Sequence, residues 1–321
     1  MEHLDQLQRY QISAYLKAGR SYGYIAKALE VNKSTISREI RRNQTGDEYD
    51  PYKAQQLAAT RQCVKHARKK YGEETWEVVN GMLRMDYSPE QISGRLKLEG
   101  RPAPSAETIY KHVWATKGSG SDLYTHLRRK NRKYQKRGNT YDSRGTIANR
   151  RDISERPAVV ESRSRFGDLE IDTVIGRDKK GALLTINDRA TGLSWIRKLE
   201  GKNSEQLAMA TIKALRPLKK MGLLHTITSD NGREFAKHEK IAKKLKVDFY
   251  FARPYCSNDR ASNENMNGLI RQYVPKGSSI RLLTDGNVRD IERKLNTRPR
   301  KRFDYKTPEE YLFEKFNLSL H

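Results

Sequence analysis

Three acidic residues in different local contexts, Asp172, Asp230 and Glu264, give the strongest chemical signal in the sequence. Asp172 falls in a run of alternating apolar and polar residues that predicts a strand, and Asp230 follows a short apolar run that predicts another. Glu264 lies in a segment with the pattern of a helix. Two aspartates on strands and a glutamate on a helix can gather oxygen ligands around hard divalent cations, as phosphoryl transfer requires.

Spacing by itself does not select these three acids from the 39 in the chain. Asp168 and Glu170 share the strand face of Asp172, because side chains alternate with a period of two. Asp188 and Glu234 are further candidates close to the same segments. On spacing alone, ordinary surface acids on a basic protein remain an equal alternative.

The composition indicates a polyanionic partner. The chain has 321 residues, enough for two or three domains, and 64 basic against 39 acidic residues give a net charge of +25. Such an excess usually serves nucleic-acid binding through counterion release. No apolar run approaches the roughly 20 residues of a membrane-spanning helix, the first residues lack the pattern of a secretory signal, and the two cysteines are far apart. We therefore expect a cytoplasmic, nucleic-acid-binding protein.

Residues 1–50 predict a helix-turn-helix DNA-binding domain. Apolar residues recur from Ile25 to Ile40 with the spacing that two packed helices bury, and Asn32 has the position of a helix cap. The last helix then turns hydroxyl and basic side chains outward, which suits base edges and phosphates in a major groove. The predicted DNA contacts are Lys33, Ser34, Thr35, Ser37, Arg38, Arg41 and Arg42. A solvated basic helix in a structural bundle is the alternative.

A weaker copy of the pattern follows a basic helical connector at residues 51–85. Ser88-Pro89-Glu90-Gln91 predicts a capping box with proline at the first helical position, and a second helix begins near Ser105. We predict a second helix-turn-helix domain over residues 86–117. Its predicted DNA contacts are Thr108, Lys111 and His112. The alternative is that the two segments are alike by chance and that no duplication occurred.

Residues 118–160 predict a basic linker. The run from Arg128 to Arg137 has no acid and few core-forming residues, which favours an extended segment lying on DNA phosphates. The residues expected to contact phosphates are Arg128, Arg129, Lys130, Arg132, Lys133, Lys136 and Arg137. A merely solvated segment is the alternative.

From residue 161 the pattern changes to three strands, a helix, a strand, a helix, a strand and a helix, which is an RNase H-like order. We predict an α/β catalytic core with a mixed five-stranded sheet over residues 161–275, then a basic helical extension over residues 276–321. Arg271 and Lys276 are expected to face DNA beside Glu264. The predicted fold class is therefore multidomain, with all-α helix-turn-helix units before an RNase H-like core.

The three acids suggest a two-metal mechanism at a phosphodiester. Two cations about 3.5–4 Å apart can activate an oxygen nucleophile and stabilise the leaving oxygen, provided that a carboxylate bridges them. Asp172 would be the bridging ligand on a central strand, Asp230 would hold the metal that activates water or a 3′-hydroxyl, and Glu264 would complete the other shell.

Several local strings resemble those of DDE transposases from bacterial insertion sequences. Residues Gly167 to Gly176 are similar to the first-aspartate motif and Ser229 to Phe235 to the second. Asn263 to Tyr273 resembles the glutamate motif of the insertion-sequence-thirty family. Residues 147–157, 296–301 and 306–310 resemble other stretches of the same family. The resemblance covers nearly the whole chain.

The resemblance implies a core that uses Mg²⁺ or Mn²⁺, two per active site, with Asp172, Asp230 and Glu264 as the catalytic and metal-binding triad. It also implies binding of double-stranded DNA, both terminal inverted repeats and target, by a homodimer or higher oligomer in the bacterial cytoplasm, associated with the nucleoid when on DNA. Strand cleavage would be followed by strand transfer through the freed 3′-hydroxyl.

The chain departs from the family pattern at Leu169, where tryptophan is usual, and at Asn258 and Ala261, which replace a common aromatic residue and glycine. These changes affect the expected packing near Glu264 but remove no acid of the triad. Two alternatives stay open: a domesticated DNA-binding regulator with an unused core, and a nuclease indifferent to sequence.

Overall fold

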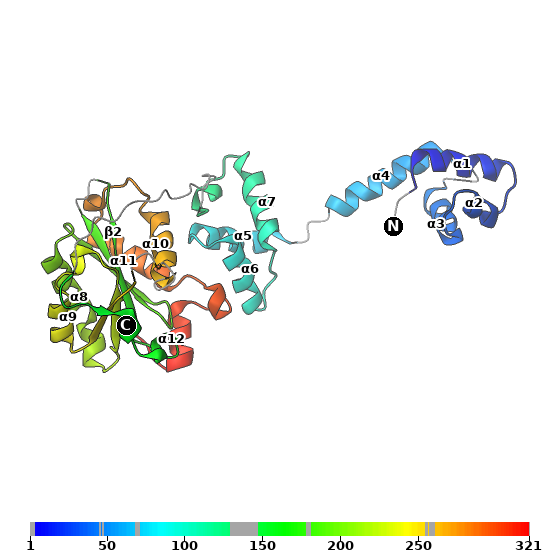
Figure 1. Cartoon of the computed structure of the whole chain (residues 1–321). Helices are drawn as coiled ribbons and strands as arrows, with labels where there is room; N and C mark the ends of the chain where they lie inside the picture. Colours follow the sequence, from blue (N-terminus) through cyan, green and yellow to red (C-terminus); the bar gives the residue numbers. More distant parts are fainter. Residues whose placement is uncertain are drawn as a thin grey trace. The chain divides into compact units, whose positions relative to one another are not determined.

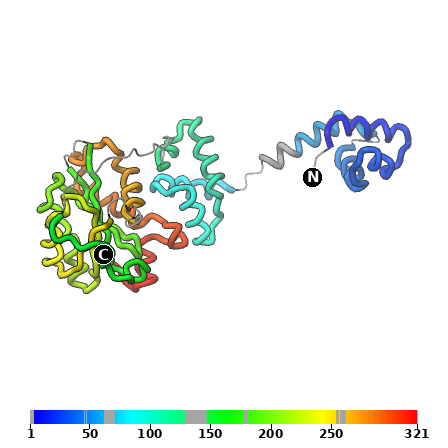
Figure 2. The backbone as a smooth tube through the Cα atoms, in the orientation of Figure 1, coloured from blue at the N-terminus to red at the C-terminus, as the bar shows by residue number. Residues whose placement is uncertain are grey.

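The computed structural model of the chain describes residues 4–44, 46, 48–67, 71–128, 147–177, 181–253, 256 and 261–320, without the side chains of residues 62–67 and 261. The chain divides into two compact units, Met1–Gly72 and Glu73–His321. Figure 1 labels their elements, and Figure 2 traces the backbone through each unit. Within these ranges no helix combines the length and the hydrophobicity that crossing a membrane requires.

The first unit is helical, as the sequence predicts. Its helices are α1 (Gln6–Lys17), α2 (Tyr22–Ala28), α3 (Lys33–Asn43) and α4 (Pro51–Ala67). Each of the first three begins at a polar cap, Asp5, Ser21 and Asn32, whose side chain accepts a hydrogen bond from a backbone N–H of the first turn. Ile25 and Ile36 are fully buried between α2 and α3, which confirms the apolar pattern of a helix-turn-helix.

A buried ion pair fixes the orientation of α3. Arg9 Nε of α1 donates to Glu39 Oε1 of α3 at 2.7 Å, with 5% and 10% of the two side chains exposed. The Tyr49 hydroxyl donates to the same oxygen at 3.0 Å. Burial, together with the charge of Glu39, raises the pKa of Tyr49. The inner face of α3 is therefore tied to α1, which leaves its opposite face to solvent.

The second unit begins with three helices that share one core. They are α5 (Glu73–Arg84), α6 (Pro89–Leu98) and α7 (Ala106–Lys117), followed by the short helix η1 (Leu123–His126). Val79 and Leu83 of α5 are fully buried beside Ile92 and Ile109. Residues 73–85, which the sequence assigns to the connector, thus belong to this helical domain, because the apolar face of α5 completes its core.

A six-stranded sheet forms the centre of the second unit. The strands are β1 (Arg151–Asp152), β2 (Asp168–Ile175), β3 (Ala182–Asp188), β4 (Ser194–Leu199), β5 (Thr226–Ser229) and β6 (Asp248–Phe251). Their order is β1-β6-β5-β2-β3-β4, with antiparallel pairing from β2 to β4 and parallel pairing among β2, β5, β6 and β1. The prediction of a mixed sheet is confirmed.

The predicted number of five strands is wrong by one. β1 lies in the segment that the sequence assigns to the linker, where Arg151 and Asp152 pair with Tyr250 and Phe251 of β6. A two-residue strand shows no periodicity, so only its partner strand defines it.

Helices cover both faces of the sheet. They are α8 (Ser204–Lys220), α9 (His238–Leu245), α10 (Ala261–Tyr273), α11 (Asp285–Asn296) and α12 (Pro308–Phe316). Leu169 and Ile171 of β2 pack in the core that contains α8 and α9, whereas Val174 packs in the core of α10 and α11. Side-chain alternation along β2 therefore supplies both layers, and the predicted α/β architecture is confirmed (Figure 1).

The basic stretch after α11 is structural. Arg298 is 2% exposed and donates to Gln91 Oε1 of α6 at 2.9 Å and to Gln272 Oε1 of α10 at 3.0 Å. Burial lowers the pKa of this guanidinium. The ring of Tyr305 lies so close to Gly94 of α6 that a Cβ there would meet it at 2.3 Å. The C-terminal segment thus holds the three-helix domain against the sheet domain.

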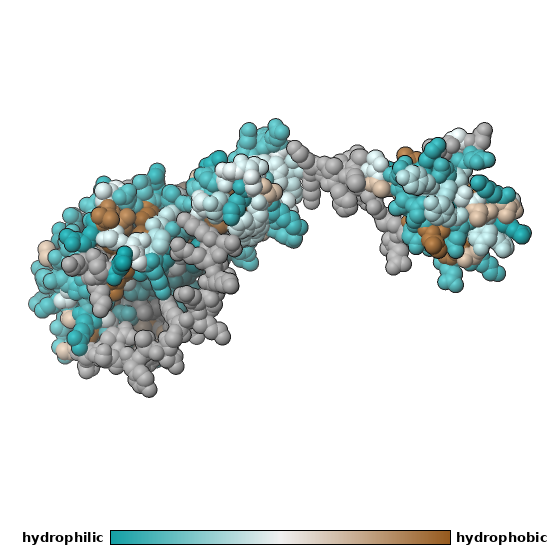
Figure 3. Space-filling view, turned by 90° about the horizontal axis from the view of Figure 1, so that it is seen from above, coloured by the Kyte–Doolittle hydropathy of each residue, from teal (hydrophilic) through white to brown (hydrophobic). Residues whose placement is uncertain are grey.

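On the face drawn in Figure 3, the described residues form a mainly hydrophilic surface with a few small apolar patches. Single exposed apolar side chains are common on folded proteins, so the informative features are the exposed large apolar side chains that lie close together.

We predict that Gly94→Ala lowers the free energy of unfolding by about 1–3 kcal/mol, because the new methyl group overpacks the contact with Tyr305. Gly81→Ala in α5 is the matched control, since a Cβ there meets nothing within 4 Å. The control should gain about 0.5–1 kcal/mol from helix propensity. Urea unfolding of both variants tests this, and equal stability would contradict the proposed contact.

Candidate active site

The sheet brings two of the three predicted acids to one edge. β2 and β5 run parallel, with Asp168 opposite Thr226 and Glu170 opposite Thr228. Asp172 comes two residues after Glu170 within β2, and Asp230 comes two residues after Thr228, just past the end of β5. The same register therefore sets these aspartates side by side where the strands emerge from the pairing.

Protein donors hold both carboxylate oxygens of Asp172. The backbone N–H of Thr173 donates to Oδ1 at 2.7 Å, and Asn267 Nδ2 of α10 donates to Oδ2 at 2.9 Å. Sequence reasoning missed Asn267. Its signal is the spacing of Asn263 and Asn267, four residues apart on one helix face.

A tight turn holds Asp230. The backbone N–H of Gly232 donates to Asp230 Oδ1 at 2.9 Å. A Cβ on Gly232 would lie 2.8 Å from that oxygen and 2.6 Å from Glu234 Oε2. Glycine is required here because two carboxylates crowd its Cα.

Glu234 is a third carboxylate at this edge, after Asp172 and Asp230, and it is only 7% exposed. Its Oε1 accepts a hydrogen bond from Thr173 Oγ1 at 2.8 Å and an ion pair from Lys202 Nζ at 3.1 Å. Burial acts to raise the pKa of Glu234, but hydrogen bonds from its own backbone amide, Thr173 and Lys202 outweigh it and leave the pKa below its usual value. Glu234 is therefore a charged anchor that joins the turn after β5 to β2.

Glu264 does not join the two aspartates in this structure. It lies in the first turn of α10 with its side chain exposed, whereas its neighbour Asn263 is buried. Within the described residues, no group of three or more histidine, cysteine, aspartate or glutamate side chains lies close enough to hold a metal ion. The helix presents Asn267 to β2 and Asn263 to β3, and Glu264 is one step round the helix from Asn263.

A buried ion pair anchors the first turn of α10. Arg189 Nη1 donates to Glu170 Oε1, and both side chains are at least 96% buried. The second oxygen of Glu170 accepts the backbone N–H of Asn263 at 3.2 Å. Asn187 Nδ2 of β3 donates to Asn263 Oδ1 at 2.5 Å. Burial raises the pKa of Glu170. Glu170 is thus a structural acid that fixes α10 to the sheet.

The other nearby acids are also structural. Asp188 accepts backbone N–H groups of Gly167 at 2.8 Å and Thr191 at 2.7 Å, and burial raises its pKa to about 6. Asp168 accepts from Arg165 Nε at 2.8 Å. Their contacts separate them from the pair formed by Asp172 and Asp230.

The outward face of α3 fits the predicted DNA reader. Thr35 is half-buried, and the other predicted residues are all exposed. Those exposed are Lys33, Ser34, Ser37, Arg38, Arg41 and Arg42. Four positive charges and two hydroxyls thus face solvent on one helix, while DNA contact itself stays a prediction.

The predicted contacts on α7 are arranged differently. His112 stacks on Trp76 with ring centroids 4.0 Å apart and lies 2.9 Å from Asn80 Oδ1. Burial lowers the pKa of this imidazole. Thr108 Oγ1 lies 2.9 Å from the capping Ser105 Oγ. Lys111 is exposed and pairs with Glu107 at 2.8 Å. His112 is therefore occupied inside the helical domain.

Among the remaining predicted contacts, Arg271 is half-buried, and its Nη2 donates to the carbonyl oxygen of Ile175 at 3.0 Å. Burial lowers its pKa. Lys276 is exposed, and Arg128 lies against Gly268 of α10. Residues 129–137, which include the other predicted linker contacts, lie outside the described residues.

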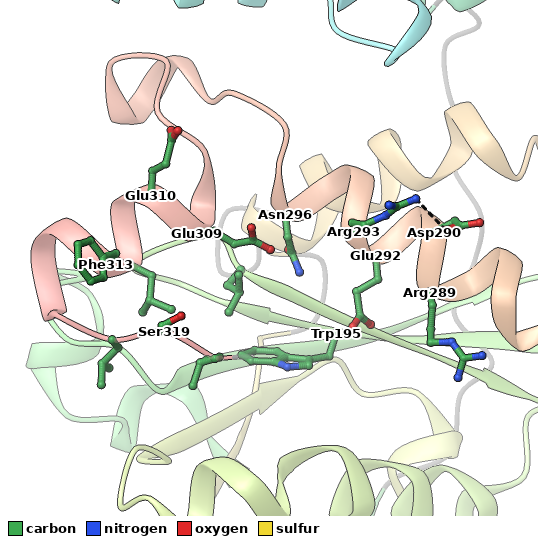
Figure 4. A pocket seen from close by; sticks show the side chains of 14 residues that line it. Trp195, Arg289, Asp290, Glu292, Arg293, Asn296, Glu309, Glu310, Phe313 and Ser319 are labelled. Atoms are coloured by element: carbon green, nitrogen blue, oxygen red, sulfur yellow. Dashed lines mark hydrogen bonds and ion pairs between the residues drawn. The ribbon is translucent and has the colours of Figure 1, made fainter.

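A cavity of about 710 Å³ lies along the outer side of β4, with Trp195 at its base (Figure 4). None of the three predicted acids lines it. Asn296 of α11 accepts the N–H of Ser194 and donates to its carbonyl oxygen, both at 2.9 Å. This bidentate contact covers the edge strand against addition of another strand.

The structure combines a helix-turn-helix unit, typical of DNA-binding proteins, with a separate α/β core that carries two aspartates at one end of its parallel strands. A family model described as a helix-turn-helix domain matches residues 1–43. The chain is 49% identical over 311 residues to a transposase for insertion sequence element IS4351 of Bacteroides fragilis, covering 96% of this chain and 95% of that protein.

It is also 33% identical over 325 residues to the transposase InsI for IS30A of Escherichia coli, covering 97% of this chain and 83% of the relative. The probable transposase for IS1161 of Streptococcus salivarius is 33% identical over 337 residues, with 98% and 94% covered. The chain belongs to the insertion-sequence transposases of the IS30 family.

We predict that Asn267→Ala weakens Mn²⁺ binding about 10–100-fold, as loss of an outer hydrogen bond to a metal ligand commonly does, because Asp172 Oδ2 loses its donor. Asn265→Ala, at an exposed position of the same helix, is the control. Calorimetric titration of each variant measures the affinity. Equal affinities would show that Asn267 does not orient the carboxylate.

Proposed function

We propose that this transposase binds the terminal inverted repeats of its insertion sequence and performs metal-dependent strand cleavage and strand transfer with Asp172, Asp230 and Glu264. The observation that carries the proposal is the common register of β2 and β5, which brings Asp172 and Asp230 to one sheet edge. The insertion-sequence transposases that match almost the whole chain support it.

The donor set fits Mg²⁺ or Mn²⁺. Carboxylate oxygens are the ligands that such hard cations prefer, and no soft or nitrogen donor is among the three acids. Asp172 and Asp230 would hold the metals from two strands, with Glu264 as the third ligand from α10. Bound cations would supply an activated oxygen nucleophile and stabilise the leaving oxygen, two ions per site.

The protein's own contribution is orientation. Thr173 and Asn267 fix the two oxygens of Asp172, and the N–H of Gly232 fixes one oxygen of Asp230. Each hydrogen bond limits the rotation of a carboxylate before any ligand arrives, which is the preorganisation that phosphoryl transfer depends on. Glu264 is carried by a helix whose first turn is anchored to Glu170.

A DNA-binding regulator with an unused core is the second candidate. The outward position of Glu264 and the absence of a three-acid cluster in the described part of the chain are the observations that favour it. An RNase H-type nuclease indifferent to sequence is disfavoured, because it has no need of the outward basic face on α3.

We predict that Asp172→Asn reduces Mg²⁺-dependent nicking of a supercoiled plasmid that carries the inverted repeats about a thousandfold. A metal contributes several kcal/mol to the transition state, and about 1.4 kcal/mol corresponds to tenfold in rate. Binding to the repeats should not change. Asp285→Asn, an exposed acid at the start of α11, is the control.

Three outcomes distinguish the candidates. Nicking by the wild type and by the Asp285 variant, but not by the Asp172 variant, supports the transposase. Tight binding without nicking by the wild type in Mg²⁺ and in Mn²⁺ identifies the regulator. Equal cutting of a plasmid without repeats identifies the nuclease.

We predict that Arg38→Ala weakens binding to the repeats by about 1–3 kcal/mol, as loss of one base contact does. Joining of pre-nicked repeat ends at saturating protein should persist, because α3 lies in a different compact unit from the acids. Lys17→Ala, which removes one exposed positive charge from α1, is the control. Equal losses of binding in the two variants would mean that α3 is not the reader.

A further inference from the structure

Helix α7 carries an outward seam that the proposed function does not use. Glu107, Tyr110, Trp114 and Lys117 follow a spacing of three, four and three residues, which places them on one stripe of the helix. Tyr110 is 44% and Trp114 is 40% exposed. The spacing is that of the contact positions in a pair of packed helices.

The aromatic surface extends beyond the helix. Trp114 stacks on Tyr124 of η1 with ring centroids 6.4 Å apart. Lys117 Nζ lies 5.4 Å from the Trp114 centroid and 4.5 Å from that of Tyr124. Partly exposed aromatic rings and one ammonium group thus form a continuous surface, of the kind enriched in protein interfaces.

The charge of this helical domain argues against DNA as the partner of the seam. Residues 73–128 contain seven lysines and arginines against eight acids, whereas residues 1–72 contain fourteen against seven. Phosphate binding relies on a positive surplus, and the domain of α7 has none. The seam also differs from the outward face of α3, where basic and hydroxyl side chains dominate and no aromatic residue occurs.

The seam is complementary to itself under a two-fold rotation. If a second α7 lies antiparallel, with the two-fold axis at the height of residue 112 but on the seam side of the helix, Glu107 faces the partner's Lys117 and Tyr110 faces the partner's Trp114. The same contacts then repeat on the other side of the axis, as an isologous interface requires. The order acid, aromatic, aromatic, base therefore pairs each charge with its opposite and each ring with a ring.

The attachment of the domain leaves this face free for such a contact. Helix α6 makes the connections to the C-terminal segment, with the Tyr87 hydroxyl just before it donating to the carbonyl of Thr297 at 2.8 Å and Gln91 Nε2 donating to that of Pro299 at 2.7 Å. Within the second unit, Figure 1 shows α7 on the side of the three-helix domain that is turned away from the sheet.

We propose that two copies of the chain associate through an antiparallel pair of α7 helices along the seam of Glu107, Tyr110, Trp114 and Lys117. The three-helix domain is then a dimerisation module and not a second DNA reader. The partner is a second copy of the same chain. The proposal rests on the proposed transposase function only for the expectation that two copies act together. The test measures mass and not strand cleavage, so the two proposals can fail separately.

Charge reversal in the full-length chain tests the antiparallel pairing. Glu107→Lys and Lys117→Glu each place like charges at both ends of the helix pair, so each should weaken dimerisation about tenfold in sedimentation equilibrium. The double variant, and an equal mixture of the two single variants, should restore it, because opposite charges face each other again. Lys97→Glu, an exposed lysine on α6, is the control and should leave the dimer unchanged.

Trp114→Ala should weaken the dimer without altering the helical circular dichroism, since the ring is 40% exposed and its loss leaves the domain core intact. Binding of repeat DNA is measured on the same variants at protein concentrations below the dimer dissociation constant, and it should be unchanged. A monomeric wild type at tens of micromolar (about the range of weak, transient dimers) overturns the proposal. So does a double variant that fails to recover, or a seam variant that loses DNA affinity at unchanged mass.

Discussion

The parallel pairing of β2 with β5 is the constraint on which the rest of the site depends. With Glu170 opposite Thr228, the same register aligns Asp172, which is still in β2, with Asp230, which directly follows β5. A slip of one residue would turn every side chain of one strand to the opposite face. Such a slip would bury Asp172 among the apolar residues that pack on α8 and α9, so the cores on both faces of β2 enforce the register that the site needs.

Buried charge then connects the helices to this register. Glu170 forms an ion pair with Arg189 and also accepts a hydrogen bond from the backbone N–H of Asn263 in the first turn of α10. Glu234 accepts a hydrogen bond from Thr173 and so joins the turn after β5 to β2. Removing one partner of a buried pair costs about 3–5 kcal/mol, because the other charge stays unpaired. Such a pair contributes little net stability compared with an apolar core, but it gives α10 one position against the sheet.

The chain separates its tasks between helices of similar pattern. Helix α3 is fixed from inside by Arg9 and exposes charge, whereas α7 turns His112 inward and exposes aromatic rings. Basic residues near the C-terminus are likewise not all available to a partner, because Arg298 is buried and joins α6 to α10 through its hydrogen bonds. Net charge therefore identifies the class of partner, but the contacts of each helix decide which surface meets it.

The sequence by itself determined the elements and the family. Caps at Asp5, Ser21 and Asn32, the alternation along β2 and the spacing of the motifs depend on neighbours in the chain, and local patterns record them directly. Tertiary structure alone shows what holds each of these acids. Asp168, Glu170 and Asp188 are acids like Asp172, and their partners from other segments of the chain (Thr226, Arg189 and the backbone of Gly167) make them structural. The same reason explains β1, the inward His112 and the outward Glu264: pairing and packing across the chain have no signature within a short stretch of residues.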